Sequence, residues 1–246
     1  MANIPLMYAQ EDCELGGKDS IEDDFAYRNN VLNADKEIRL AFVRKVYGLL
    51  SIQLLATVAI ASVFLLVKPV QGFIHENQWM MLLSFFLGLV TLFALIAKRR
   101  DHPTNLYLLA TFTVIQAYTV GVTVSYFDTY VVLQALVITF TVVSSLTAYT
   151  FNTKRDFSFV AYGLVAGLCV LIMGSILQMI IQSSALNLAL GCAGAVLFSL
   201  FLIFDTQQMM TVLSPEEYIM ATITLYLDIL NLFLEILRIL SHFNQN

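Results

Sequence analysis

Two aspartates stand in stretches of the chain that are otherwise apolar. Asp228 lies within LYLDILNLFLEIL, and Asp205 follows the apolar run AVLFSLFLIF. A carboxylate at the centre of a membrane-spanning helix costs on the order of 3 kcal/mol to insert, so such residues usually face the bundle interior or water and mark an ion pathway or a proton site. The meaning of the two acids therefore depends on the solvent around these segments.

The composition identifies that solvent as a lipid bilayer. Hydrophobic residues make up 59% of the chain and charged residues 13%, and the mean hydropathy is +0.77. These values lie outside the range of soluble domains. Each spanning helix needs roughly 20 apolar residues, so 246 residues leave room for one helical bundle and no second globular domain. The sequence predicts an all-α, polytopic membrane protein.

The apolar runs are separated by short polar links that are poor candidates for the hydrocarbon core. Counting these runs predicts seven transmembrane helices. They cover Val46–Val67, Trp79–Ala97, Leu106–Val124, Tyr130–Tyr149, Phe157–Ile181, Leu186–Phe204 and Tyr218–Leu240.

The amino-terminal segment differs in composition from the rest of the chain. Residues 1–35 are polar and acidic, with little apolar periodicity, and they lack the basic start and apolar core of a cleavable signal peptide. We predict a disordered cytoplasmic tail over 1–35 and a transmembrane domain over 36–246. The first span is then the insertion signal.

Positive charge predicts the orientation of the bundle. Lys and Arg that flank spans are retained on the cytoplasmic side. Nine such residues fall on one side, which places the amino terminus in the cytoplasm: Lys36, Arg39, Arg44, Lys45, Lys98, Arg99, Arg100, Lys154 and Arg155. The link before the last span has no cation, so a re-entrant last segment is an alternative.

Asp228 is expected deep in the last helix. Ser214 and Pro215 resemble a helix N-cap and first turn, with a glutamate placed for a capping box. Asp228 follows Pro215 by 13 residues, or about 20 Å, within a hydrocarbon slab of roughly 30 Å. Asn231 and Glu235 continue the same face and predict a polar stripe. Glu235 can alternatively reach the headgroups or pair with Arg238.

Asp205 provides a second intramembrane acid if the sixth helix continues to about Val212. Two neighbouring carboxylates cannot both ionise cheaply, so a contact between Asp205 and Asp228 would form a coupled proton switch. Fully deprotonated, the pair offers hard oxygen ligands to calcium. Arg99, flanked by Lys98 and Arg100, is the candidate cation for stabilising that state, although the triplet also fits simple membrane anchoring. The estimated depths of the aspartates differ by about 10 Å, so contact is undecided.

Other residues of chemical interest predict packing rather than catalysis. Cys169 and Cys192 lie in apolar spans, and the three histidines share no helix face, so we expect no disulfide framework and no histidine metal site. Glycines at 163 and 167 in span five, and at 191 and 194 in span six, predict close helix approach, with dimerisation as the alternative.

Several motifs together resemble the transmembrane Bax-inhibitor-motif, or lifeguard, family over about residues 36–240. TLYLDILNLFLEILRIL in the last span is the most specific, and FDTQQMM and LSPEEY precede it. AFVRKVYGLLSIQLL, HPTNLYLL and the Lys154–Phe157 link add to the similarity. Within that family the chain is most similar to the Golgi anti-apoptotic branch. Phe204 and Thr224 depart from the tyrosine and serine of many relatives, and neither change removes a charge.

The resemblance implies a fold, a location and an activity. It implies a seven-helix bundle with the seventh helix central, in Golgi, endoplasmic reticulum or related membranes, that leaks calcium from stores and suppresses apoptosis. Asp205 and Asp228 correspond to a pH-sensing pair, one residue of Lys98–Arg100 to its basic latch, and Glu216 or Glu217 to an acid of the conduction path. Calcium is then the transported ion, with no cofactor and no enzymatic activity expected.

The expected partners are the lipid bilayer, calcium and protons, with no nucleic acid. Apoptosis regulators, calcium-release channels and a second copy of the chain are left open as protein partners. An anti-apoptotic interaction protein without conduction and a proton/calcium exchanger are alternative functions. An intramembrane aspartyl protease fits poorly, because Leu225–Leu227 before Asp228 lack the glycine-x-glycine signature of that class.

Overall fold

Helices form all the regular structure in the residues that the computed structural model describes, 36–153 and 157–244. This confirms the predicted all-α class. The predicted tail over 1–35 and the link cations Lys154 and Arg155 lie outside the described residues. The α-helices are α2 (Lys36–Leu66), α3 (Lys68–Glu76), α4 (Trp79–Ala97), α5 (Thr104–Val124), α6 (Thr129–Asn152), α7 (Ala161–Ile181), α8 (Ser184–Thr211) and α9 (Tyr218–Asn244).

The predicted count of seven spans is matched approximately. Six of the described helices are long and apolar enough to cross a membrane, namely α2 and α4 to α8. α9 has comparable length but is not among the six, and it contains Asp228, Glu235 and Arg238. The chain is a multi-pass membrane protein whose last helix differs chemically from the others.

Two helix boundaries differ from the sequence prediction in ways that affect the site. α8 continues to Thr211, seven residues beyond the predicted end at Phe204, because Thr206 and Met209 bury their side chains in the bundle. A 3-10 turn over Pro215–Glu217 precedes α9, which begins at Tyr218. Asp205 is therefore an interior residue of α8, and Asp228 is only ten residues from the start of α9.

The short helix α3 was not predicted. Pro69 occupies its first turn, where a missing N–H is tolerated, and this separates α3 from the end of α2. Ile74 is buried and Phe73 is exposed, while Gln71 donates to the Ser125 carbonyl oxygen at 3.0 Å and places α3 against the end of α5. We call this side of the bundle the α3 end, and the side with Lys98–Arg100 the basic end.

α9 extends from the basic end to the α3 end. At its start, the Lys45 Nζ lies 3.4 Å from the centre of the Tyr218 ring. At its other end, the Asn244 Nδ2 donates to Asp128 Oδ2 at 3.4 Å, beside the start of α6. The last helix thus extends between the two ends of the described bundle, and its full crossing of the membrane stays a prediction.

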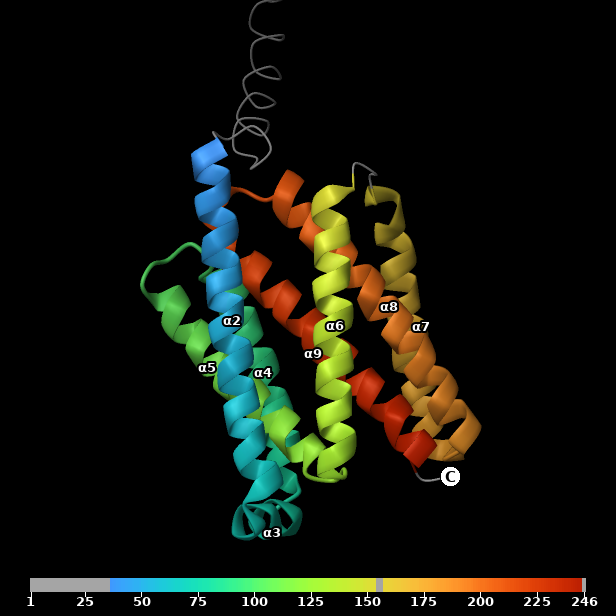
Figure 1. The fold of residues 1–246 in the computed structure, drawn as a ribbon. Helices are drawn as coiled ribbons and strands as arrows, with labels where there is room; N and C mark the ends of the chain where they lie inside the picture. Colours follow the sequence, from blue (N-terminus) through green and yellow to red (C-terminus); the bar gives the residue numbers. More distant parts are fainter. Residues whose placement is uncertain (1–35, 154–156, 245–246) are drawn as a thin grey trace, which may run out of the picture.

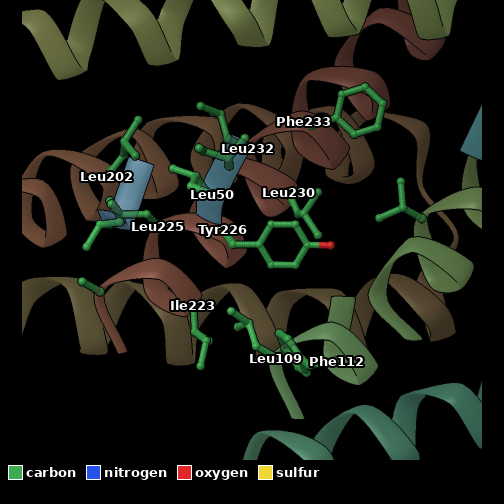
Figure 2. Packing of buried hydrophobic residues seen from close by; sticks show 14 of the residues in the cluster. Leu50, Leu109, Phe112, Leu202, Ile223, Leu225, Tyr226, Leu230, Leu232 and Phe233 are labelled. Carbon is green, nitrogen blue, oxygen red and sulfur yellow. The ribbon is translucent and has the colours of Figure 1, made fainter. Parts of the chain in front are cut away.

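α9 is the central helix of the described bundle. It runs obliquely behind α2 and α6, as Figure 1 shows, and it packs against α8, α6, α2 and α5. Its buried side chains include Leu225, Tyr226 and Leu232, each no more than 1% exposed. Figure 2 shows Tyr226 among leucines of α9, with Leu109 and Phe112 of α5 beside it. The other helices present many large apolar side chains outward, where they meet lipid.

Glycines on α8 allow α9 to approach closely. A Cβ at Gly194 would lie 2.7 Å from Cδ of Glu235, and one at Gly191 would lie 3.1 Å from Cγ1 of Ile239. Small residues at membrane helix interfaces allow such approach. The predicted packing role of these two glycines is confirmed, whereas Gly163 on α7 has open space around it.

Gly194→Val is expected to lower the thermal unfolding midpoint of the detergent-solubilised protein. The added side chain must displace the Glu235 carboxyl group, and overpacking of this kind typically costs about 1 to 3 kcal/mol. Gly163→Val is the matched control, since it adds the same β-branched residue to an open helix face. Equal midpoints for the two variants would contradict this account of the α8–α9 contact.

Candidate functional site

Asp228 is a buried carboxyl group on the central helix. The residue is 7% exposed, and its Oδ2 atom has no hydrogen-bond donor among the described residues. An unpaired buried carboxylate is unfavourable, because desolvation of a charge costs several kcal/mol. The site therefore requires another group to satisfy or neutralise this oxygen.

Asp205 of α8 is adjacent to Asp228. The two carboxyl groups lie within hydrogen-bonding reach of each other, and the Thr224 hydroxyl lies within reach of Asp205. The start of α9 at Tyr218 rather than Pro215 removes about 4.5 Å of the expected depth difference of about 10 Å, and the oblique course of α9 reduces the difference further (Figure 1). The structure thus brings the two predicted acids together.

No described cation is within ion-pairing distance of either aspartate. Two carboxyl groups in contact can share one proton, or they can bind a cation when both are ionised. Two carboxylates alone supply fewer oxygens than the six to eight that calcium usually takes. The described residues contain no cluster of three or more His, Cys, Asp or Glu, so a calcium ion here would depend on water or backbone oxygens for its other ligands.

The predicted latch residue Arg99 has a different partner in this structure. Its Nη2 lies 3.2 Å from Glu217 Oε1, and the Arg100 Nη2 lies 3.3 Å from the same oxygen. α4 ends at Ala97, so the arginines lie beyond the helix end, whereas Asp205 is inside α8. Contact between Arg99 and the aspartates, expected from sequence, is not formed, and the latch role stays a prediction.

Lys98 is occupied by a local ion pair. Its Nζ lies 2.8 Å from Asp101 Oδ2 on the surface of the α4–α5 link. The hydrogen bond to Asp101, together with the charge of that carboxylate, raises the pKa of Lys98. Lys98 therefore contributes a fixed surface charge and makes no described contact with the aspartates.

The two glutamates of the α8–α9 link have different surroundings. Glu216 is exposed, and its backbone N–H donates to the Ser214 Oγ at 3.4 Å. Glu217, at the capping-box position, instead directs its carboxylate to Arg99 and Arg100, and its side chain is 15% exposed. Glu217 thus connects the start of α9 to the α4–α5 link.

The polar stripe of α9 continues beyond Asp228, as predicted. Asn231 is half-buried and donates through Nδ2 to the Leu227 carbonyl oxygen at 2.9 Å. Glu235 Oε2 lies 2.9 Å from Arg238 Nη1, and the Glu235 side chain packs against Gly194 of α8. The alternative pairing of Glu235 with Arg238 is therefore the one that the structure adopts.

A buried hydrogen-bond network on α2, α5 and α9 was missed from sequence. Gln53 Nε2 donates to Thr113 Oγ1 at 2.7 Å, and the Thr57 hydroxyl lies 2.7 Å from the Tyr226 hydroxyl. Thr57 already donates to the Gln53 carbonyl oxygen, so Tyr226 is the donor of the second bond. The only sequence signal was the i, i+4 spacing of Gln53 and Thr57 within an apolar helix.

These features define the class of protein: a polytopic helical membrane protein with an acidic pair buried at its central helix. The chain belongs to the family described as "Inhibitor of apoptosis-promoting Bax1", which residues 39–245 match. It is 43% identical over 228 residues to protein lifeguard 4 of Mus musculus, covering 93% of this chain and 96% of the mouse protein.

A viral and a fungal relative also match this chain over most of its length. The chain is 43% identical over 231 residues to the Golgi anti-apoptotic protein of Vaccinia virus (strain Lister), covering 94% of this chain and 98% of the viral protein. It is 34% identical over 247 residues to Bax inhibitor 1 of Schizosaccharomyces pombe (strain 972 / ATCC 24843), covering 100% and 92% of the respective chains. The similarity extends over nearly the full length of each relative.

Tyr226→Phe is expected to destabilise the folded protein by about 0.5 to 1.5 kcal/mol, the usual net value of one hydrogen bond. The variant removes only the hydroxyl group that donates to Thr57. Thermal unfolding in detergent measures the loss, with Tyr107→Phe as the control because Tyr107 is 71% exposed. A Tyr226→Phe protein as stable as the control would show that this bond contributes nothing.

Proposed function

We propose that the protein is a pH-sensitive calcium leak channel of intracellular membranes that lowers store calcium and inhibits apoptosis. The observation that carries the proposal is the contact between Asp205 and Asp228 at the central helix, with a buried Asp228 oxygen that lacks a described donor. Carboxylate oxygens are preferred calcium ligands. Acids inside a membrane usually belong to an ion or proton pathway.

The conduction path follows the polar stripe of α9. Glu217 lies at the basic end, the aspartate pair in the interior, and Asn231 and Glu235 towards the α3 end. Glu217 and Glu235 are about 16 Å and 10 Å from Asp228 along the helix, at 1.5 Å per residue. Acidic groups at these intervals offer a calcium ion successive transient sites.

Protons regulate the path by competing with calcium for the aspartate pair. A proton shared between the two carboxyl groups removes one negative charge and weakens calcium binding. Arg99 and Arg100 act as the basic latch through Glu217, since their ion pairs fix the α8–α9 link from which α9 begins. The pair and the latch therefore act on the same helix.

The relatives support the biological setting. The viral relative carries the name Golgi anti-apoptotic protein, and the yeast relative is named Bax inhibitor 1. We infer a Golgi location, with the endoplasmic reticulum as the neighbouring alternative, a cytoplasmic amino terminus, and an anti-apoptotic role without enzymatic activity or a cofactor.

Calcium flux from liposomes tests the proposal. Purified wild-type protein is expected to release trapped calcium at a rate that changes with pH, and Asp228→Asn and Asp205→Asn are expected to lose most of the flux and its pH dependence. Each asparagine removes the ionisable group with little change in shape. Glu76→Gln is the matched control, because Glu76 is an exposed acid of α3.

Three outcomes distinguish the alternatives. No flux at any pH, with intact folding, would overturn the channel and favour an anti-apoptotic interaction protein. Calcium driven uphill by an imposed pH gradient would identify a proton/calcium exchanger. Unchanged flux in both asparagine variants would exclude the aspartate pair as the ion site.

Breaking the latch is expected to shift the pH midpoint of the flux. Arg99→Ala removes one ion pair and Glu217→Gln removes two, each worth up to about 1 kcal/mol, which corresponds to a midpoint shift of up to about 0.7 pH unit per pair. Glu216→Gln is a neighbouring comparison, since Glu216 has no described ion pair. Flux profiles of Arg99→Ala and Glu217→Gln identical to wild type would exclude these arginine pairs as the latch.

A further inference from the structure

A cavity of about 170 Å3 lies between α4, α5 and α9, apart from the aspartate pair. Phe85 and Leu89 of α4 form its outer rim and are 56% and 39% exposed, so the cavity opens to the lipid side of the bundle. Leu227 of α9 lines it on the inner side. A molecule of the bilayer can therefore reach the central helix here without crossing the aqueous ends.

Gly88 leaves this cavity open. A Cβ at Gly88 would lie 3.4 Å from Gln116 Nε2 and 3.6 Å from Ile115 Cγ2, so even a methyl group would fill space between α4 and α5. A larger side chain at this position would occupy the cavity itself. The absence of a side chain at Gly88 thus leaves space between two helices that are otherwise packed against each other.

The cavity lining is polar towards the α3 end and apolar towards the basic end. α4 runs from the α3 end and α5 runs back to it, so Ser84 and Thr119 lie on the α3 side of Gly88. Leu92 and Phe112 lie on the other side. Ser84 is five residues, or about 8 Å along α4, beyond Trp79, which is an exposed residue of the kind that favours the membrane interface.

Three polar side chains of the cavity lining, those of Ser84, Gln116 and Thr119, can form hydrogen bonds with a ligand. The Ser84 and Thr119 hydroxyl groups lie within hydrogen-bonding distance of each other, at 3.2 Å, and of the Met81 and Ile115 carbonyl oxygens, and their remaining lone pairs can accept a further hydrogen bond. Gln116 also lines the cavity, and its side-chain amide can both donate and accept a hydrogen bond. The site offers both a donor and acceptors, as a hydroxyl group requires.

None of the described residues that line the cavity carries a charge. A phosphate headgroup or a fatty-acid carboxylate would enter this site without a cation, at a large desolvation cost. A neutral lipid with one hydroxyl group and an elongated apolar body matches the lining better, because Ser84 and Leu92 are separated by about 12 Å along α4.

We propose that this cavity binds a sterol from the leaflet at the α3 end. The sterol hydroxyl group bonds to Gln116, Ser84 and Thr119, and one edge of its ring system lies over Gly88 towards Leu92 and Phe112. The rest of the molecule stays in contact with lipid beyond Phe85 and Leu89. The bound sterol touches α9 at Leu227, next to Asp228 in the chain.

Photolabelling tests the site on the full chain. Wild-type protein in phosphatidylcholine liposomes with a photoactivatable cholesterol is expected to be labelled within α4 and α5, as mapped by mass spectrometry. Gly88→Leu is expected to abolish this labelling by filling the cavity. Gln116→Leu is expected to reduce it about fivefold, the value of roughly one hydrogen bond.

Gly163→Leu is the matched control, because it adds the same side chain to a glycine with open space on α7. Its labelling of α4 and α5 should equal that of wild type. Unlabelled cholesterol should displace the probe, and equal displacement by dioleoylglycerol would overturn the sterol assignment. Wild-type labelling located elsewhere, or unchanged labelling in a folded Gly88→Leu or Gln116→Leu protein, would overturn the site. Sterol binding requires no calcium conduction, so the result is independent of the flux measurement.

Discussion

The enclosure of a carboxyl-bearing helix by lipid-facing helices is the constraint on which this fold depends. Asp228 cannot face hydrocarbon, so α9 must be surrounded by protein along its length. α2, α5, α6 and α8 provide that surrounding surface while presenting apolar side chains outward. The contrast between a polar central helix and apolar outer helices follows directly from the difference between protein and lipid as solvents.

The alignment of α8 with α9 follows from small glycines on α8 that face long side chains on α9. Gly191 and Gly194 bring the helix axes close, so the Glu235 and Arg238 side chains of α9 pack over α8. Further along the same antiparallel interface, Asp205 reaches Asp228. A slip along either helix would remove the glycines from beneath the long side chains and separate the aspartates, so packing and the acidic contact reinforce one alignment.

Much of this structure could be predicted from local sequence patterns. Hydropathy, N-cap residues and acidic residues within apolar runs can each be recognised from one short segment of the chain. The helical class and the packing role of two α8 glycines followed from such patterns, whereas the depth difference of about 10 Å expected between the two acids did not match the structure. The contact of Glu217 with Arg100 joins positions 117 residues apart, and the Thr57–Tyr226 bond joins positions 169 apart. The local sequence around each residue does not predict which distant residue it will contact. α3 was missed since its nine residues are too few for a strong periodic signal.

The acidic side chains at the start, in the interior and at the end of α9 differ in whether an arginine pairs with their charge. Glu217 has two arginines and Glu235 has Arg238, whereas the described residues give Asp205 and Asp228 only each other and neutral groups. A carboxylate with a fixed guanidinium partner needs no further charge. Two adjacent carboxyl groups without one can stay buried only with a proton or a bound cation. The interior pair is therefore the acidic position along α9 that has no arginine partner among the described residues.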